Sequence, residues 1–491
     1  MPNLTSAVGT ISSAGIGSGL DVNNIVTSLM SVERQPLTRL QNTATTLQTK
    51  LSAFGQLKSV VSALQDAARP LFNPDSFALT NATSTDPTSV SAGTSTAAVP
   101  GIYSVSVASL SASQSLVSAS GQFVDGTSVV GSGSLTIRLG TWSAGQTTFT
   151  PKAGSTDITV PIGASENTLA GIRDKINAAN AGVSATIVSD ANGARLALQS
   201  TNTGAANGFR VSVADADLGN GDAAGLSRLA YDPLGTGAQL ALAQSAADTQ
   251  ATINGIAVSA SSNTLANVID GMTFSLSRVT TQPVTVNVTR NTEAIKGKLA
   301  AFVAAYNTLN SFLSSATHYN PATKQAALLQ GDGTTTGMQN QLHSLLSQPS
   351  PASAAFTTLS SLGVQAQKDG SLKLDDAKFA LAVANLPELT KALANVDASV
   401  PANDGIGKRF AVWADKLLAS NGSLPGKTTA IQSQIDSNRK SQEAMNDRLV
   451  QIEKRLRAQY TSLDTTMSKA NALAKYVTQQ FYTRPNTDTR N

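Results

Sequence analysis

The sequence predicts a multidomain α+β protein in which helical segments from both ends of the chain enclose two nested, inserted β-rich domains. Three observations predict this fold class. The chain has 491 residues, enough for roughly three or four domains of about 150 residues each. Apolar residues recur at helical spacing near both ends, whereas the middle alternates apolar and polar residues as half-buried strands do. A β-rich insertion between two helical parts keeps both termini at one end of the molecule.

The longest helical pattern lies near the carboxyl end, where no Pro or Gly occurs from Lys427 to Arg484. Apolar residues there alternate steps of three and four, which is the heptad spacing of a coiled coil. Two polar residues, Asn438 and Gln442, occupy positions in this row, and two successive steps of four around Leu456 form a stutter. A lone helix cannot bury such a row, so a partner helix is needed. The clearest members of this row, which we call the seam, are Met445, Leu449, Ile452, Leu456, Tyr460, Leu463 and Met467.

The natural partner for the seam lies at the other end of the chain. Asp21 can cap a helix by accepting a backbone N–H. Pro36 either interrupts this helix or starts a new one, because proline lacks the N–H that a helix interior needs. Another apolar stripe continues to about Pro70. The side of the first helix that we expect to be buried carries Leu20, Ile25, Leu29 and Val32.

The terminal helical, coiled-coil region is therefore predicted to comprise residues 1–40 and 430–491, and to be disordered in the free subunit. Residues 1–18 are mainly Ser, Gly, Ala and Thr, and such segments stay disordered until they bind. A lone helix without its partner cannot recover an ordering entropy of about 1–2 kcal/mol per residue.

The middle of the chain is predicted to be β-rich. A helix at 168–180 is followed by two alternating runs that flank Asn192-Gly193, a strong hairpin signal. The strands before residue 111 are expected to pair with those after residue 241, which makes one domain from two chain pieces. We predict an inner β-rich head domain from 79–112 with 241–289, and an outer one from 113–240. The other expected strands are 101–107, 134–139, 156–162, 251–258, 271–276 and 284–288.

Helical periodicity returns at Thr292 and predicts a mainly helical leg domain from residues 41–78 and 290–429. Within it, residues 359–375 are expected to form a two-stranded hairpin with a Gly turn, after which Asp375 caps the next helix. Pro425-Gly426 is expected to be a hinge into the long carboxyl-terminal helix. The remaining helices are expected from residue 338 to 346, from about 387, and from 410 to 418.

Composition excludes several classes of function. Charged residues are only 13% of the chain and the net charge of +4 is spread evenly, so a nucleic-acid partner or an anionic membrane is not expected. No apolar run is long enough for a membrane span, and the first residues lack a cleavable secretory signal. There is no Cys, and the two histidines, His318 and His343, have no metal-site or triad spacing. We therefore expect no metal, no cofactor and no enzymatic activity.

Four stretches resemble one protein family. Residues 11–21, which read ISSAGIGSGLD, together with the apolar pairs that follow to Glu33, are similar to the amino terminus of bacterial flagellar filament cap proteins, also called flagellar hook-associated protein 2. The strand that begins Pro100-Gly101-Ile102-Tyr103 and the signature at 359–375 are also similar to this family. Residues of about 165–204 resemble the flagellin hook IN motif, which flagellins and cap proteins share.

The resemblance implies a structural assembly protein at the tip of the flagellum. Such a protein forms a homo-oligomeric ring, for which the family suggests a pentamer, and it retains exported flagellin and promotes its folding and insertion. A flagellar export chaperone is a further expected partner, and the location is extracellular. In this interpretation Leu20, Ile25 and Leu29 join the seam from Met445 to Met467 as the assembly residues.

Two other functions remain open at this point. A hook–filament junction protein of the same export system also has helical termini, although the combination of motifs favours a cap protein. A surface adhesin is a different class of protein, and binding of glycans by the head domains would indicate it.

Overall fold

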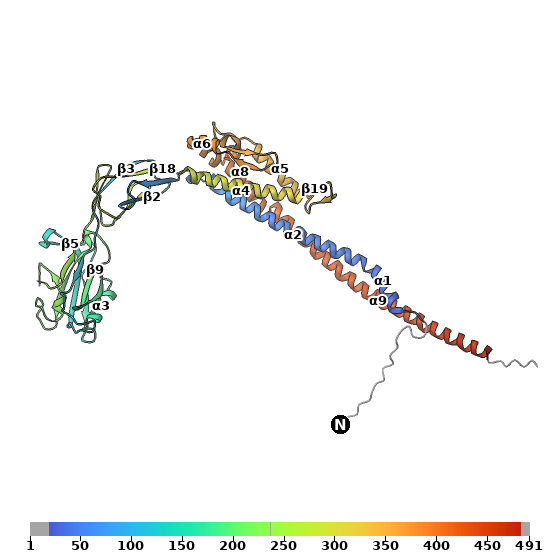
Figure 1. Cartoon of the computed structure of the whole chain (residues 1–491), viewed down its shortest axis with the longest axis horizontal. Helices are drawn as coiled ribbons and strands as arrows, with labels where there is room; N and C mark the ends of the chain where they lie inside the picture. The colour runs from blue at the N-terminus through green and yellow to red at the C-terminus, as the bar shows by residue number, and fades with distance from the viewer. Residues whose placement is uncertain (1–18, 236, 483–491) are drawn as a thin grey trace, which may run out of the picture. The chain divides into compact units, whose positions relative to one another are not determined.

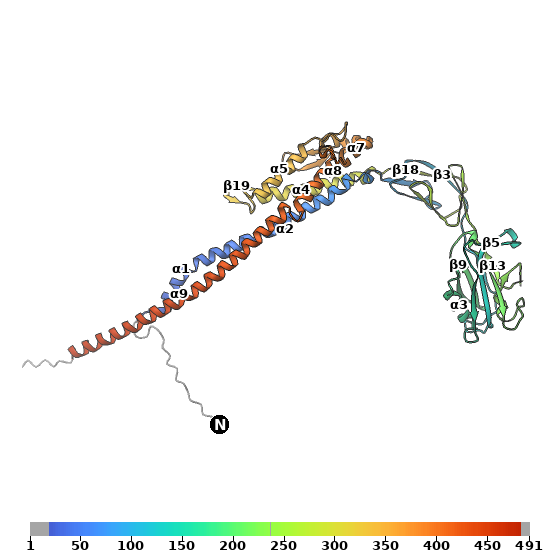
Figure 2. The same ribbon diagram turned by 180° about the vertical axis from the view of Figure 1, so that it is seen from behind.

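The computed structural model describes residues 19–235 and 237–482 (Figure 1, Figure 2). The chain divides into two compact units. One comprises Met1–Pro74 and Lys296–Asn491, and the other comprises Asp75–Ile295. The first is mainly helical and the second is β-rich, so the multidomain α+β class with helical terminal segments is confirmed.

The helical unit contains long helices from both ends of the chain and a group of shorter ones between them. Two small hairpins accompany the helices, formed by β19 (Tyr319–Asn320) with β20 (Gln325–Ala326) and by β21 (Val364–Ala366) with β22 (Leu372–Leu374). The helices are α1 (Val22–Glu33), α2 (Gln35–Ala68), α4 (Thr292–Thr317), α5 (Gly333–Ser347), α6 (Asp376–Ala384), α7 (Leu386–Ala394), α8 (Ile406–Leu418) and α9 (Ser423–Tyr482).

Side-chain caps define several helix starts as expected. The Asp21 carboxylate accepts the N–H of Asn24 at 2.9 Å at the start of α1. The Asp375 carboxylate accepts two N–H groups of the first turn of α6 at 3.1 Å each. Pro36 lies in the first turn of α2, where its missing N–H costs no helical hydrogen bond. It therefore starts a new helix.

The expected hinge at Pro425-Gly426 is wrong. The helix α9 begins at Ser423 and continues through both residues to Tyr482. Proline is tolerated because it falls in the first turn, where the N–H groups have no partner inside the helix. An ion pair between Lys427 and Asp332, 2.6 Å apart, also holds the start of α9 to the start of α5.

The core of the helical unit is organised around aromatic rings. Phe302 and Tyr306 of α4 pack edge-on against Phe410 of α8, with ring centroids 5.0 and 6.3 Å apart. All three side chains are fully buried. The helix α2, which follows α1, lies along both α8 and α9.

The pH dependence of this core follows from Tyr306. Its hydroxyl is buried and has no hydrogen-bond partner among the described residues, and burial raises the pKa of Tyr306 from 10.0 to about 12. Because the hydroxyl ionises at a lower pH in the unfolded chain than in the folded one, its contribution to the free energy of unfolding is fully present below pH 10. This contribution is lost as the pH rises from 10 through 12. We expect Tyr306→Phe to raise the free energy of unfolding by about 1 kcal/mol at pH 7, and to remove part of the loss above pH 10. Denaturant titrations at pH 7 and 11 measure both, and a destabilised phenylalanine variant would contradict the assignment.

The β-rich unit contains two separate hydrophobic cores. The inner core lies between a five-stranded sheet of order β1-β18-β3-β14-β15 and a three-stranded sheet of order β16-β17-β2. Pairing of β3 with β14 and β18 confirms that strands before residue 111 join strands after residue 241. The strands are β1 (Thr80–Ser84), β2 (Val90–Thr94), β3 (Gly101–Ser109), β14 (Thr249–Ile253), β15 (Ile256–Ala260), β16 (Thr264–Ile269), β17 (Met272–Leu276) and β18 (Val284–Arg290).

The outer core lies between a six-stranded sheet, in which β12-β11-β10-β5-β6 are consecutive and β7 pairs with β5, and a four-stranded sheet of order β13-β4-β9-β8. The helix α3 (Leu169–Ala178) packs on β8. The strands are β4 (Ser115–Val117), β5 (Gly133–Trp142), β6 (Phe149–Pro151), β7 (Ile158–Ile162), β8 (Val183–Asp190), β9 (Gly193–Ser200), β10 (Gly208–Asp215), β11 (Tyr231–Asp232), β12 (Gly237–Ala238) and β13 (Ala241–Gln244).

Two Asn-Gly pairs lie at hairpin turns in the β-rich unit, and only one of these hairpins was predicted. The hairpin β8–β9 closes with Asp190 opposite Gly193, as the Asn-Gly signal predicts. The single strand expected at 251–258 is wrong, because the chain turns at Asn254-Gly255 and forms the hairpin β14–β15. Both turn residues have positive φ, 49° and 83°, the conformation that an Asn-Gly turn provides.

Candidate assembly site on the paired terminal helices

The first helix, α1, packs on the last helix, α9. The helices α1 and α2 follow one another along α9 and run in the opposite direction to it (Figure 1, Figure 2). A small apolar cluster joins α1 to α9, and its buried members are Val22, Val26, Met30, Leu449 and Ile452. Its partly buried members are Leu20, Leu37, Met445, Leu456 and Tyr460. We call this set the terminal cluster.

The expected buried side of α1 is wrong. Leu29 is 39% exposed and Val32 is 60% exposed, while Ile25 is half-buried and lies outside the terminal cluster. Of the predicted side, only Leu20 joins the terminal cluster. The helix carries two apolar rows, and period alone cannot decide which row meets α9. Sequence reasoning missed the row of Val22, Val26 and Met30, although its continuation to Leu37 across the break between α1 and α2 was a usable signal.

Five of the seven seam residues, from Met445 to Tyr460, lie in the terminal cluster. The other two do not: Leu463 is 45% exposed and Met467 is 37% exposed. The two polar residues of the row also have a structural role. Asn438 is buried, and the side-chain amide of Gln442, one turn away on α9, donates to its Oδ1 at 2.6 Å.

Polar contacts at this site are few and exposed. Arg457 of α9 donates to Oδ1 of Asn23 on α1 at 3.1 Å, and to Glu453 on its own helix at 2.8 Å. Exposed pairs of this kind contribute at most about 1 kcal/mol. Apolar burial in the terminal cluster therefore supplies most of the attraction between α1 and α9.

The disorder predicted above for the terminal region of the free subunit remains an untested prediction. The packing of α1 on α9 within one chain leads to the opposite expectation for the residues of the terminal cluster. We expect residues 20–37 and 445–460 to resist protease in the free subunit, because cleavage requires local unfolding and loss of the terminal cluster. Limited proteolysis, with fragments identified by mass spectrometry, measures this. Early cuts between residues 445 and 460 would instead support disorder of this region.

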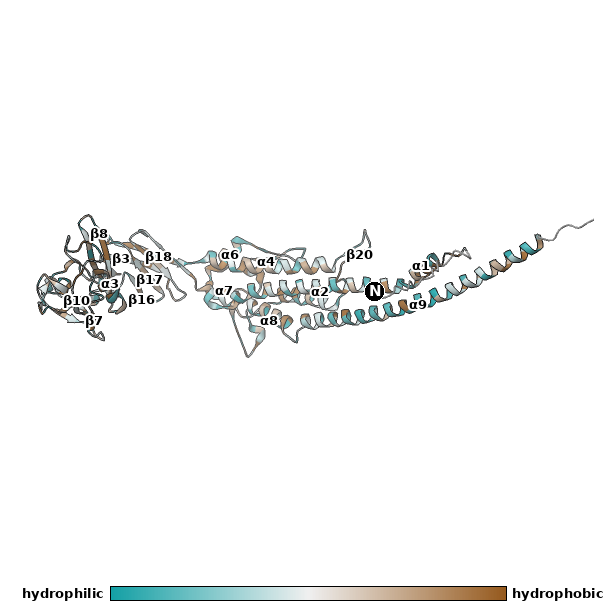
Figure 3. Cartoon of the chain, turned by 90° about the horizontal axis from the view of Figure 1, so that it is seen from below, coloured by the Kyte–Doolittle hydropathy of each residue, from teal (hydrophilic) through white to brown (hydrophobic). Residues whose placement is uncertain are grey.

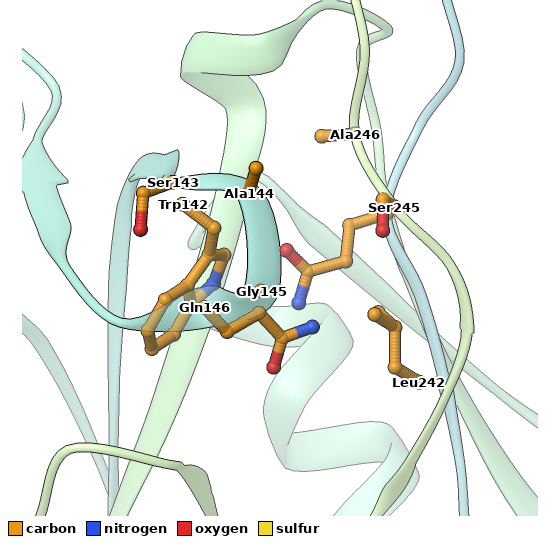
Figure 4. A pocket seen from close by; sticks show the side chains of 9 residues that line it. Trp142, Ser143, Ala144, Gly145, Gln146, Leu242, Ser245 and Ala246 are labelled. Carbon is orange, nitrogen blue, oxygen red and sulfur yellow. The ribbon is translucent and has the colours of Figure 1, made fainter.

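A cleft of about 550 Å³ lies in the outer β domain (Figure 4). Trp142 and Gln146 line it, together with Gln114. The indole N–H of Trp142 and the amide of Gln114 bond to the backbone of Phe209, at 2.8 to 3.1 Å. Gln146 accepts the hydroxyl of Tyr231 at 2.5 Å. These polar side chains already form hydrogen bonds within the protein, and no titratable group lines the cleft. We therefore assign the cleft no function.

The described residues contain neither a metal-ligating group nor a membrane-spanning helix. Both His318 and His343 are exposed on the helical unit. Within residues 19–235 and 237–482, no group of three or more acidic or histidine side chains is placed to hold a metal ion. Among the helices of the described part of the chain, none combines the length and the apolar character that crossing a membrane requires.

Family models match most of the chain. A model described as the flagellar hook-associated protein 2 N-terminus matches residues 18–114, and one described as its C-terminus matches residues 246–472. The flagellin hook IN motif matches residues 148–202. The motif was therefore identified correctly, but it starts earlier than the expected residue 165 and includes β6 and β7 as well as α3, β8 and β9.

Individual relatives align over nearly the whole length. The flagellar hook-associated protein 2 of Escherichia coli (strain K12) is 33% identical over 496 residues, covering 97% of this chain and 99% of the relative. The B-type flagellar hook-associated protein 2 of Pseudomonas aeruginosa is 31% identical, covering 96% and 98%. A crystal structure of the D1-D2-D3 domains of the flagellar cap protein FliD from Escherichia coli superposes with a TM-score of 0.62 at 30% identity, covering 77% of this chain and 99% of that one. Identity at this level, sustained over both chains, shows that the chain belongs to the flagellar hook-associated protein 2 family of flagellar cap proteins.

Proposed function

We propose that the chain is a structural protein of the cap at the tip of the bacterial flagellum. Copies of it form a ring there, retain exported flagellin and promote its folding and insertion into the growing filament. The observation that carries this proposal is full-length similarity to flagellar hook-associated protein 2, together with the superposition on a flagellar cap protein. Because these similar proteins are described as flagellar hook-associated protein 2 and as a flagellar cap protein, we favour a cap protein over a hook–filament junction protein.

Flagellin is the proposed main partner, and the flagellin hook IN motif at residues 148–202 supports this. A ring of five copies, an export chaperone as a transient partner, and an extracellular place at the flagellar tip belong to the same proposal. The proposed role requires binding and release rather than a covalent reaction, so we propose no catalytic activity.

The geometry of the terminal helices suits contacts that form and release repeatedly. The terminal cluster has five buried side chains, far fewer than the core of the outer β domain. Exchange of polar Asn438 or Gln442 for leucine would be expected to strengthen the pairing of α9, because polar seam residues trade stability for register. A small apolar contact of this kind can open without unfolding either compact unit.

Deletion of the gene tests the cap function directly. A strain without this protein is expected to secrete monomeric flagellin into the medium and to make no filaments, and a plasmid copy is expected to restore both. Normal filaments in the deletion strain would overturn the proposal. A deletion strain that leaks a separate cap protein together with flagellin would indicate the junction role instead.

Self-association is tested on the purified full-length chain. We expect sedimentation velocity at rising concentration to show reversible oligomers, because contacts that must release during assembly are weak in isolation. A strict monomer at high micromolar concentration would count against ring formation by the chain alone.

A further inference from the structure

The helix α6 carries apolar residues on both of its sides. On one side Phe379 and Ala382 are buried. The opposite side is exposed, although a surface helix normally carries polar residues there. Leu381 on this side is 75% exposed. The exposed apolar residues recur at helical spacing, and we call them the α6 stripe: Ala377, Ala380, Leu381 and Ala384.

A groove between α5 and α8 has an apolar lining elsewhere on the same unit. Its cavity of about 480 Å³ is lined by Leu345 of α5 and by Val412 and Trp413 of α8. The indole N–H of Trp413 donates to Oε1 of Gln341 at 2.9 Å, which fixes the ring in place. Cavities of about 300–1,000 Å³ with an apolar lining and a few polar groups are typical of binding sites. No residue of α6 lines this α5–α8 groove; both α6 and α8 are labelled in Figure 3, where hydrophobic residues are brown.

The charged side chains that line the α5–α8 groove are mainly cationic. Arg409 and Lys416 line it, and its only acidic lining residue, Asp404, is 9% exposed. The guanidinium of Arg409 donates to the backbone carbonyl oxygens of Asp404 at 3.0 Å and of Pro349 at 3.1 Å, which are neutral acceptors. The lining therefore carries a positive net charge around an apolar floor.

The α6 stripe and the α5–α8 groove match in length and in charge. The stripe runs from Ala377 to Ala384, and Arg409 and Lys416 of the groove are likewise seven positions apart on one helix. At a helical rise of 1.5 Å per residue both lengths are roughly 10 Å. Asp376, whose side chain is 72% exposed beside its ion pair with Lys296, lies next to the start of the stripe. An acidic group beside the stripe complements the cationic groove, and such complementarity fixes the register of a contact.

We propose that the α6 stripe of one copy of this chain docks in the α5–α8 groove of a second copy. The inference rests on the ring of the proposed function and deepens it by naming the two surfaces that meet. Because the two surfaces differ, the contact is heterologous and passes from copy to copy, so it can close a ring. A contact between identical surfaces would stop at a two-fold dimer.

A second copy is the favoured occupant because the same chain carries both halves of the contact. One copy leaves its stripe uncovered, and the next copy provides a groove of the opposite charge. The stripe is short and three of its four residues are alanine, so the contact buries little apolar surface. A weak contact of this kind agrees with the reversible association expected above.

Two variants that each damage one surface test the proposal in the full-length chain. Leu381→Asp places a charge in the stripe and leaves the groove intact, whereas Val412→Asp places a charge in the groove and leaves the stripe intact. Burial of the unpaired carboxylate is expected to weaken self-association about tenfold or more in either variant. Sedimentation velocity is measured at a concentration at which the wild type forms oligomers. We expect each variant alone to be monomeric.

An equimolar mixture of the two variants gives the decisive result. Only one intact stripe and one intact groove remain for each pair of chains, so we expect the mixture to form dimers and nothing larger. Lys416→Glu is a second groove variant at an exposed position, and it decides the test if circular dichroism shows that Val412→Asp is unfolded. The control is Val279→Asp, which adds the same charge at a 57% exposed position of the inner β domain and is expected to associate as the wild type does.

Three results would contradict the docking of the stripe in the groove. Association of both surface variants at the wild-type level would exclude this contact and leave the ring itself standing. Loss of association in Leu381→Asp alone, or a mixture that stays monomeric, would show that the stripe meets a surface other than the groove. A wild type that is monomeric at high micromolar concentration would overturn the ring and this contact together.

Discussion

Replacement of Ile452 by aspartate is expected to abolish swarming while both compact units stay folded. Ile452 is 9% exposed and lies in the terminal cluster with Val26 and Met30. An aspartate there would place an unpaired carboxylate in an apolar contact, which costs roughly 2–4 kcal/mol. The terminal cluster is separate from the aromatic core of the helical unit, so we expect α1 to detach from α9 without global unfolding.

Val450→Asp is the matched control for this prediction. Val450 lies two residues away on α9 and is 62% exposed, so it adds the same charge without burying it. Circular dichroism melts and swarming assays of both variants are the measurements. Short or absent filaments and leaked flagellin are expected for Ile452→Asp alone. Normal swarming would contradict the role of the terminal cluster in assembly, and a globally unfolded protein would show that the cluster belongs to the core of the subunit.

Phe410→Ala is expected to unfold the helical unit. The Phe410 ring is fully buried and packs against Phe302 at 5.0 Å and Tyr306 at 6.3 Å. Loss of a buried aromatic ring costs about 3–5 kcal/mol through lost transfer energy and the cavity that remains. This is a large part of the stability of an ordinary domain. The β-rich unit has its own cores and is expected to keep its melting temperature.

Leu381→Ala serves as the control, because Leu381 is also in the helical unit but is 75% exposed. Differential scanning calorimetry separates the two units if they melt independently. We expect the transition of the helical unit to fall or vanish in Phe410→Ala and to stay unchanged in Leu381→Ala. A single unchanged transition in both variants would show that the aromatic contacts do not stabilise the unit.

Local features were predictable because their determinants are adjacent in the chain. An aspartate at an N-cap binds N–H groups two or three residues later, so Asp21 and Asp375 could be placed without knowledge of the fold. The Asn-Gly turn between β8 and β9 was predictable for the same reason. The seam from Met445 to Tyr460 followed from helical period alone, and the family followed from short motifs at both ends and in the middle.

The errors arose where two local signals competed. Pro425-Gly426 is a strong breaker pair, yet it lies in the first turn of α9, where a breaker costs little. Asn254-Gly255 is a turn signal inside an alternating run, and the turn lets β14 and β15 extend the five-stranded sheet beyond β3. In both cases the position of the pair within an element decided its effect.

By itself the sequence determined the fold class, the helix caps, the seam and the family of this protein. Only the tertiary structure decided which apolar row of α1 meets α9 and where that contact ends. Period identifies apolar rows but not which of them faces α9: Val22, Val26 and Met30 are buried, whereas Leu29 and Val32 are exposed. Burial is a property of two surfaces that meet, so it cannot be read from one of them.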